Sequence, residues 1–185
     1  MYDYAMNLKP QDVVVLLKLL SYGDDRPSYA QMGEELFLSP SEVHASVRRA
    51  KEAHLIVGAE PDEGTLDKAA VLEFLVHGLK YSFPPERGEL ARGMPTSYAA
   101  EPLKQKISMG NDPPPVWPSP QGTARGYSLK PLYKTVPQAA QADRKLYELL
   151  ALVDAIRDGR VRDREMAEHE LRDRLNSPVY AHSQF

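Results

Sequence analysis

Residues 28–57, SYAQMGEELFLSPSEVHASVRRAKEAHLIV, decide which fold this chain is expected to adopt. Apolar residues recur at helical spacing in two segments, which are separated by a turn of a few residues. The second segment has a strong start, because Ser39 is a favoured N-cap, Pro40 suits the first helical position and Glu42 completes a capping box. The apolar run 55–57 is short and partly β-branched, which favours a strand. The stretch therefore predicts two helices joined by a tight turn and followed by a short strand.

Two further helices are predicted on either side of this stretch. Pro10 suits a first helical position, and the apolar residues behind it keep helical spacing as far as the break at Gly23. After an acidic loop, Asp67 is a candidate N-cap for a helix whose expected buried set is Val71, Leu72, Leu75, Val76 and Leu79. Residues 1–79 are therefore expected to form one small helical domain.

The length and composition fit one domain of average size, or one small domain with an appendage. The chain has 185 residues, no cysteine and a formal net charge of -3. Without cysteine there are no disulfides, thiolate metal sites or cysteine nucleophiles, and a reducing compartment fits. No apolar run approaches the length of a membrane span, and residues 1–10 lack the apolar core of a signal peptide. We therefore expect a cytoplasmic protein with no membrane partner.

Proline is the unusual residue, with 16 prolines against 11 glycines. Ten of them lie within residues 80–136: Pro84, Pro85, Pro95, Pro102, Pro113, Pro114, Pro115, Pro118, Pro120 and Pro131. Proline cannot continue a helix or a central strand, so this segment is expected to be extended and irregular. It is also the basic part of the chain, because it has eight basic and four acidic residues while residues 1–79 have seven and thirteen.

The last segment, residues 137–185, predicts helices again. An apolar stripe is expected to cover the fourth helix of the same chain or to pair with a second copy, and its members are Leu146, Leu149, Leu150, Val153 and Ile156. The acids between Asp154 and Asp173 alternate with arginines, which predicts an exposed, salt-bridged face. The single tryptophan, Trp117, lies among prolines and is expected to pack on its own domain.

At the paired helices the sequence resembles the bacterial winged-helix regulators of the MarR and Lrp/AsnC types. The resemblance lies within residues 10–79, and the matching positions are Met32-Gly33, Leu36, Leu38-Ser39, Val43, Val47 and Leu55-Ile56. Phe37 and His54 depart from the family pattern, since glycine often stands at both places and the backbone there is often left-handed. We therefore expect the turn at Phe37 to have a different shape.

The resemblance over residues 10–79, together with the proline and helical patterns of the remaining segments, predicts a fold class for the whole chain. We expect a mainly α protein with an N-terminal winged helix-turn-helix domain (1–79), a Pro-rich, basic, extended segment (80–136), and a helical tail that packs or dimerises (137–185).

In this family the second helix of the motif enters the major groove of DNA, which is about 12 Å wide and accepts one α-helix. Helical spacing places Val43, Val47 and Ala50 on one side of the helix, so the opposite side faces the DNA. Arg48 and Arg49 are the candidates for guanine contact, because a guanidinium can bond both O6 and N7. The full set of expected DNA-binding residues is Ser39, Ser41, Glu42, His44, Ala45, Arg48, Arg49, Tyr29 and Gln31.

The charge of this region argues against a simple electrostatic fit to DNA. Residues 26–58 contain four basic and four acidic groups, whereas DNA-binding domains usually carry an excess of positive charge. The predicted loop after the strand adds acids that phosphate would repel, at residues 60–63. We therefore expect the Pro-rich segment to fold back near the DNA and to supply phosphate contacts from Arg87 and Arg92.

The sequence is compatible with two functions from different classes. The first is a bacterial or phage transcriptional regulator that binds specific double-stranded DNA as a homodimer, since a twofold protein suits a palindromic site. The second is an antitoxin or adaptor whose Pro-rich segment and C-terminal helices bind a partner protein. We expect no catalytic residues, no metal site and no cofactor, because no spacing of His, Asp, Glu or Ser forms a catalytic or ligand pattern.

Overall fold

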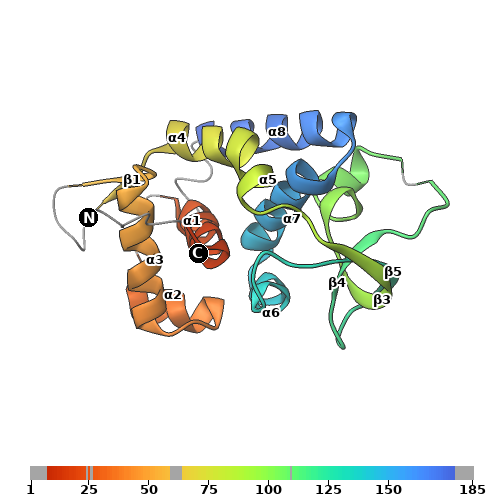
Figure 1. The fold of residues 1–185 in the computed structure, drawn as a ribbon, viewed down its shortest axis with the longest axis horizontal. Helices are drawn as coiled ribbons and strands as arrows, with labels where there is room; N and C mark the ends of the chain where they lie inside the picture. Colours follow the sequence, from red (N-terminus) through yellow and green to blue (C-terminus); the bar gives the residue numbers. More distant parts are fainter. Residues whose placement is uncertain (1–7, 24, 26, 59–63, 109, 178–185) are drawn as a thin grey trace, which may run out of the picture.

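The computed structural model describes residues 8–23, 25, 27–58, 64–108 and 110–177. Figure 1 shows helices at one end of the molecule and a small sheet at the other, with further helices between them. The fold is therefore mixed α/β. The expected fold class, a mainly α protein with an N-terminal winged helix-turn-helix and an irregular middle segment, is wrong, because the middle segment builds a sheet.

The first three helices follow the apolar pattern of the sequence closely. Their bounds are α1 (Pro10–Tyr22), α2 (Tyr29–Leu36) and α3 (Pro40–Glu52). Ser39 caps α3 and Glu42 closes the capping box, as expected from the sequence. The core of this unit consists of fully buried leucine, valine and methionine side chains, among them Leu16, Leu17, Met32, Leu36 and Val43.

The turn between α2 and α3 depends on two backbone features. The amide of Leu38 donates to the carbonyl of Gly33 at 2.9 Å, and a Cβ added to Gly33 would meet the Leu38 carbonyl oxygen at 2.7 Å. Phe37 has φ 57, which is the left-handed conformation that glycine usually supplies at a helix C-terminus. The expected change of turn shape is therefore not found, and Phe37 adopts the strained conformation instead.

A short hairpin follows α3, built from β1 (Ile56–Val57) and β2 (Thr65–Leu66) in antiparallel register. His54, at φ 59, is also left-handed and lies between the end of α3 and this strand. The strand expected at residues 55–57 is confirmed. The acidic loop expected at residues 60–63 lies outside the described residues.

The fourth predicted helix is present with an internal irregularity. It comprises α4 (Lys68–Glu73), a π-helical turn (Phe74–Gly78) and α5 (Leu79–Ser82). The Asp67 side chain caps α4 by accepting from the amide of Ala70 at 3.0 Å, as the sequence predicts.

The segment 80–136 contains the sheet that the sequence did not predict. Its strands are β3 (Arg87–Pro95), β4 (Pro115–Pro118) and β5 (Ala124–Leu129), and 3₁₀ turns occupy Ser97–Ala99 and Leu103–Gln105. Each strand pairs with both of the others, so the small sheet closes on itself. The prolines of β3 and β4 lie at the strand ends, where a missing amide donor is tolerated.

Helix α7 lies at the centre of the molecule and is flanked in sequence by two others. The bounds are α6 (Val136–Ala142), α7 (Arg144–Asp158) and α8 (Val161–Asn176). α7 contacts α1, α5, α6 and α8, and its apolar stripe is buried by the chain itself. No helix in the described part of the chain combines the length and apolar character needed to cross a bilayer.

A buried polar network fastens the sheet to α7. The Asp154 carboxylate accepts from the Trp117 indole at 2.7 Å, from the Thr96 hydroxyl at 2.8 Å and from Arg157 at 2.8 Å. The Arg157 guanidinium also donates to the Phe83 carbonyl at 2.9 Å. Burial raises the pKa of Asp154, and the positive charge of Arg157 opposes that rise. The expected packing of Trp117 on its own domain is confirmed, whereas the expected exposure of Asp154 is wrong.

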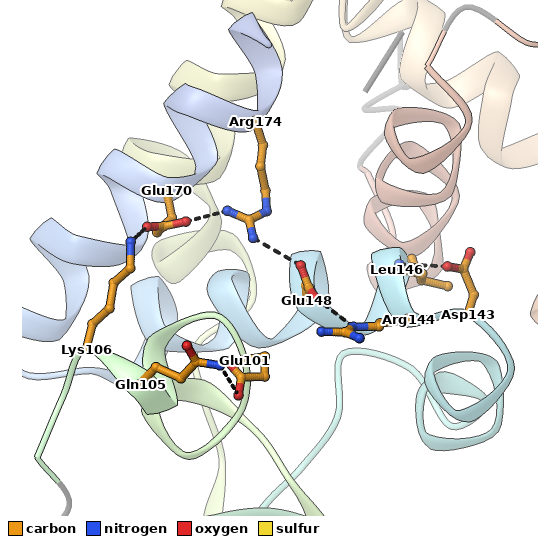
Figure 2. Close-up of polar contacts among 9 residues, drawn as sticks. All are labelled: Glu101, Gln105, Lys106, Asp143, Arg144, Leu146, Glu148, Glu170 and Arg174. Carbon is orange, nitrogen blue, oxygen red and sulfur yellow. Dashed lines mark hydrogen bonds and ion pairs between the residues drawn. The ribbon is translucent and has the colours of Figure 1, made fainter. Parts of the chain in front are cut away.

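A second network joins α7 to α8 and to the end of the 3₁₀ turn Leu103–Gln105 (Figure 2). Glu170 on α8 is paired with both Lys106 and Arg174, and Arg174 reaches Glu148 on α7 at 3.0 Å. Arg144 extends the chain of charges by pairing with Glu148 at 3.2 Å. The acids of α8 therefore include the buried Glu170, which holds the network together, as well as the exposed face that the sequence predicts.

Candidate nucleic-acid interface

Helix α3 has one face in the core and one face in solvent. Val43, Ser46, Val47 and Ala50 are buried, as the spacing of the apolar residues predicts. The solvent face carries Ser41, Glu42, His44 and Arg48, with Ala45 half-buried between them. Small residues alternate with polar ones on this face, so it would let a helix approach a groove closely.

The N-terminus of α3 is closed by its own capping box. The Ser39 hydroxyl accepts from the Glu42 amide at 3.2 Å, and the Glu42 carboxylate accepts from the Ser39 amide at 2.8 Å and from its hydroxyl at 2.7 Å. These bonds from Ser39 hold the pKa of Glu42 below its ordinary value. A phosphate at this helix end would have to displace the Glu42 carboxylate, so the DNA-binding role expected for Ser39 is weakened.

The two adjacent arginines of α3 have different environments. The Arg49 guanidinium makes two bonds to Asp12 on α1, at 2.7 and 2.6 Å, and its side chain is 11% exposed while that of Asp12 is 0% exposed. Hydrogen bonding to Asp12 holds the pKa of Arg49 above its ordinary value, although burial opposes the shift. Arg48 is exposed and forms no hydrogen bond or ion pair with the described residues. Arg49 therefore holds α3 against α1, and the guanine contact expected of both arginines stays a prediction that Arg48 is better placed to meet.

The start of α2 also lies beside the exposed face of α3. The Tyr29 ring meets the His44 ring edge-on, with centroids 5.5 Å apart. Gln31 is exposed but its amide donates to Glu35 at 3.2 Å and to the Tyr22 hydroxyl at 3.3 Å. The structure thus brings Tyr29 together with His44, and it directs the side-chain amide of Gln31 towards α1.

A cation that the sequence did not single out lies near the N-terminus of α3. Lys134 is exposed and contributes electrostatically to lowering the pKa of Glu42. It precedes α6, which packs against α2. No local pattern relates Lys134 to α3, because the two are brought together only by the packing of α6 on α2.

The phosphate contacts expected from β3 are not near α3. Arg87 pairs with Asp158 at the end of α7 at 2.6 Å, and the Arg92 guanidinium donates to the Gly122 carbonyl at 3.0 Å. The sheet that carries both lies at the opposite end of the molecule from α2 and α3 (Figure 1). The expectation that the Pro-rich segment folds back onto the helix-turn-helix face is therefore wrong for Arg87 and Arg92.

A cluster of ionisable groups joins α1, α2 and α7 in a cleft beside this interface. Lys18, whose side chain is 4% exposed, lies 2.5 Å from a Glu35 oxygen and 2.6 Å from an Asp143 oxygen. Burial raises the pKa of both carboxyls, but hydrogen bonds from Lys18 and from other neighbouring donors together outweigh it, so both pKa values lie below the ordinary range. Asp143 also caps α7 by accepting from the Leu146 amide at 3.0 Å (Figure 2). Each group has a structural partner, so the cluster holds helices together.

Comparisons with known proteins supply no further guide to this surface. A scan against protein-family models, a search of curated proteins and a search of solved structures each found no match. The function is therefore inferred from the geometry and charge of the chain itself.

Proposed function

We propose that the protein binds double-stranded DNA with α3 in the major groove and acts as a bacterial or phage transcriptional regulator. The observation that carries the proposal is Arg48, an exposed guanidinium on the solvent face of α3 without a partner among the described residues. An arginine in this position can make a bidentate contact to guanine. Its neighbours Ser41 and Ala45 are small, which leaves room for the groove walls.

The rigidity of α3 supports the same proposal. Its start is fixed by the Ser39–Glu42 capping box and its side is fixed to α1 by the Arg49–Asp12 pair. A side chain on such a helix has little freedom to lose when it binds a base, so less of the contact energy is spent on ordering.

The charge around α3 limits the affinity that this surface can have. Glu34, Glu42 and Glu52 are exposed on α2 and α3, while Arg48 and Lys134 are the nearby exposed cations. We therefore expect weak binding to non-specific DNA and a shallow dependence of affinity on salt. Specific binding would depend on contacts to base edges more than on phosphate charge.

The test is DNA binding by the full chain, measured by fluorescence anisotropy on the DNA upstream of its own gene and on shuffled DNA. Arg48→Ala should weaken binding to the specific DNA by about 5- to 150-fold, the range for one bidentate base contact. The matched control is Arg162→Ala, because Arg162 on α8 is equally exposed and also lacks a partner among the described residues. Equal losses in both variants, or no salt-dependent binding by the unmodified protein at low ionic strength, would refute the proposal.

We also propose that the protein acts as a homodimer in the cytoplasm, with two copies of α3 reading the halves of a twofold site. The apolar stripe of α7 is covered by its own chain, so the dimer would use other surfaces. Sedimentation equilibrium of the protein with and without DNA tests this, and a monomer in both conditions would contradict it.

The antitoxin or adaptor function stays a prediction, but two apolar features of the segments it would use, the Trp117 ring and the stripe of α7, are internal. Trp117 is 1% exposed and the α7 stripe is buried. A partner protein would have to use the remaining exposed surface of the sheet and of α8.

A further inference from the structure

The sheet at the far end of the molecule has a second exposed surface, the outer face of the β3–β5 ribbon. Leu90 lies opposite Tyr127, and Arg92 lies opposite Arg125, in antiparallel register. Because alternate residues of a strand point to the same side, both pairs share one face. Leu90 is 45% exposed and Tyr127 is 49% exposed, and both arginines are exposed.

The other face of the ribbon explains why this one is in solvent. Gly126 and Gly93 lie on it, and an added Cβ at Gly126 would meet the Pro114 carbonyl oxygen at 1.8 Å. At Gly93 an added Cβ would meet the Trp117 carbonyl oxygen at 2.2 Å. These glycines let β4 and its approach pack directly against the backbone of the ribbon, so larger side chains are confined to the outer face.

Arg92 and Arg125 face each other across the two strands, so their positive charges repel each other unless an anion lies between them. Like charges directly opposite on neighbouring strands destabilise a sheet. Two cations near the ends of these strands have carboxylates, since Arg87 pairs with Asp158 and Lys130 pairs with Glu86. Neither Arg92 nor Arg125 pairs with a carboxylate of the described residues, and Arg92 instead donates to the Gly122 carbonyl at 3.0 Å.

An exposed aromatic ring beside two uncompensated guanidinium groups suits a chain that has both phosphates and unpaired bases. Arginines neutralise phosphate, and a tyrosine face stacks on any base that is not already stacked in a duplex. The carboxylates of an acidic protein would neutralise the two arginines, but such a protein would offer no base to stack on the Tyr127 ring. The segment 80–136, with its excess of four positive charges, supplies a favourable field, although Glu89 is exposed next to Leu90 in the chain.

We propose that the outer face of the β3–β5 ribbon binds single-stranded DNA, with Arg92 and Arg125 on the phosphates and a base stacked on Tyr127. The choice of DNA over RNA rests on the proposed function, which brings the protein to DNA; the choice of a single strand does not. The ribbon and α3 lie at opposite ends of the molecule (Figure 1), so they would contact different segments of nucleic acid.

The experiment measures binding of the full chain to labelled oligodeoxythymidine of about 16 nucleotides, a length within the range covered by small stacking domains. An oligouridine of equal length, a DNA duplex and polyglutamate are measured beside it. We expect salt-dependent binding to oligodeoxythymidine that is tighter than binding to oligouridine or polyglutamate.

Four variants assign that binding to the ribbon. Arg125→Gln should reduce the slope of log affinity against log salt by about 0.7, the value for one phosphate of a single strand. Tyr127→Ala should weaken binding about ten-fold, within the range for one stacked base, while Tyr127→Phe should keep wild-type affinity. The control Lys104→Gln removes an equally exposed charge from the Leu103–Gln105 turn and should leave affinity within about two-fold.

The outcomes separate this proposal from the one for α3. Arg48→Ala should weaken duplex binding and leave oligodeoxythymidine binding unchanged, so the proposal for one site can be refuted without refuting the other. Equal effects of Arg125→Gln and Lys104→Gln, or equal affinity of Tyr127→Ala and Tyr127→Phe, would overturn the proposal. Tighter binding of polyglutamate would make the ribbon a site for acidic proteins, and tighter binding of oligouridine would make it an RNA site; both results would refute it.

Discussion

The two ends of the molecule are held together by different kinds of contact. The unit α1–α3 packs through leucine, valine and methionine side chains that recur at helical spacing. The β3–β5 sheet has a glycine face pressed against a neighbouring backbone, and it is fastened to α7 through the buried carboxylate of Asp154. Periodic apolar packing can be read from a short stretch of sequence, whereas contacts of the second kind join residues that are far apart in the chain. The following predictions test how far this difference extends.

The largest effect should come from Asp154, which anchors the sheet. Asp154→Ala leaves the buried guanidinium of Arg157 without its carboxylate and leaves the Trp117 and Thr96 donors without an acceptor. We expect a loss of about 4 kcal/mol in the free energy of unfolding. Trp117 is the only tryptophan, so its selectively excited fluorescence reports on the sheet and on its contact with α7, while far-ultraviolet circular dichroism reports mainly on the helices.

Unfolding in urea is followed by the tryptophan signal and by the far-ultraviolet signal, and the two midpoints are compared. If the sheet depends on Asp154 more than α1–α3 does, the tryptophan signal should be lost at lower urea than the helical signal. A conservative control is Asp154→Asn, which keeps the shape and one acceptor and should lose less. A change in stability below about 1 kcal/mol for Asp154→Ala would show that the network is not the anchor.

The next largest effect should come from Arg49 in the helical unit. Arg49→Ala leaves the Asp12 carboxylate buried with, among the described residues, only the Lys9 amide as a hydrogen-bond donor, at 2.7 Å. We expect a loss of about 3 kcal/mol in urea unfolding, while the adjacent Arg48→Ala should change stability by less than about 0.5 kcal/mol. A double variant, Asp12→Leu with Arg49→Met, removes both charges and should recover much of the loss. Equal stability of the two single variants would show that the Arg49–Asp12 pair is not structural.

Arg48 and Arg49 show which features of α3 the sequence predicts and which it does not. The apolar face of α3, its capping box and the exposure of Arg48 follow from local spacing, and each was predicted. Arg48 and Arg49 are neighbours on that helix, and nothing local distinguishes them. The distinction comes from Asp12 on α1, because its carboxylate is buried against one side of α3 and takes the arginine nearest to it.

The sheet could not be predicted for a related reason. Its strands contain prolines at their ends and glycines where the backbones meet, so they lack the alternation that identifies a half-buried strand. Pairing partners such as Leu90 and Tyr127 are joined through a long intervening segment. The same absence of a local signal hid Lys134, which reaches α3 only because α6 packs on α2.

A third prediction concerns the cluster of Lys18, Glu35 and Asp143, which joins α1 and α2 to the start of α7. The pKa of Asp143 is held low in the folded state, since Lys18 and the amides at the start of α7 outweigh its burial. A lowered pKa stabilises the folded state above the ordinary carboxyl range, near pH 4, and this stability is lost as the pH falls through the lowered pKa. Asp143→Asn should therefore cost about 1.5 kcal/mol at pH 7 and less at pH 3.

The measurement is the free energy of unfolding in urea between pH 3 and pH 7, for the wild type and Asp143→Asn. The difference between the two proteins should shrink as the pH falls. Glu168→Gln is the control, because its carboxylate pairs with Arg172 on the exposed side of α8. It should give a smaller and flatter difference, since an exposed pair contributes little. A difference for Asp143→Asn that is constant with pH would contradict the lowered pKa.

The smallest effect should be a gain in stability at Phe37, the left-handed residue between α2 and α3. A side chain with a Cβ costs about 1 kcal/mol in this conformation, and glycine avoids the cost. Phe37 is 52% exposed, so removing its ring sacrifices little burial. Phe37→Ala loses the ring but keeps the strain, so Phe37→Gly should unfold at higher urea than Phe37→Ala by the equivalent of about 1 kcal/mol. Equal stability of these two variants would mean that the turn relaxes when the ring is removed. In that case the left-handed conformation would be held by the phenylalanine side chain, and not by the close approach of Leu38 to Gly33.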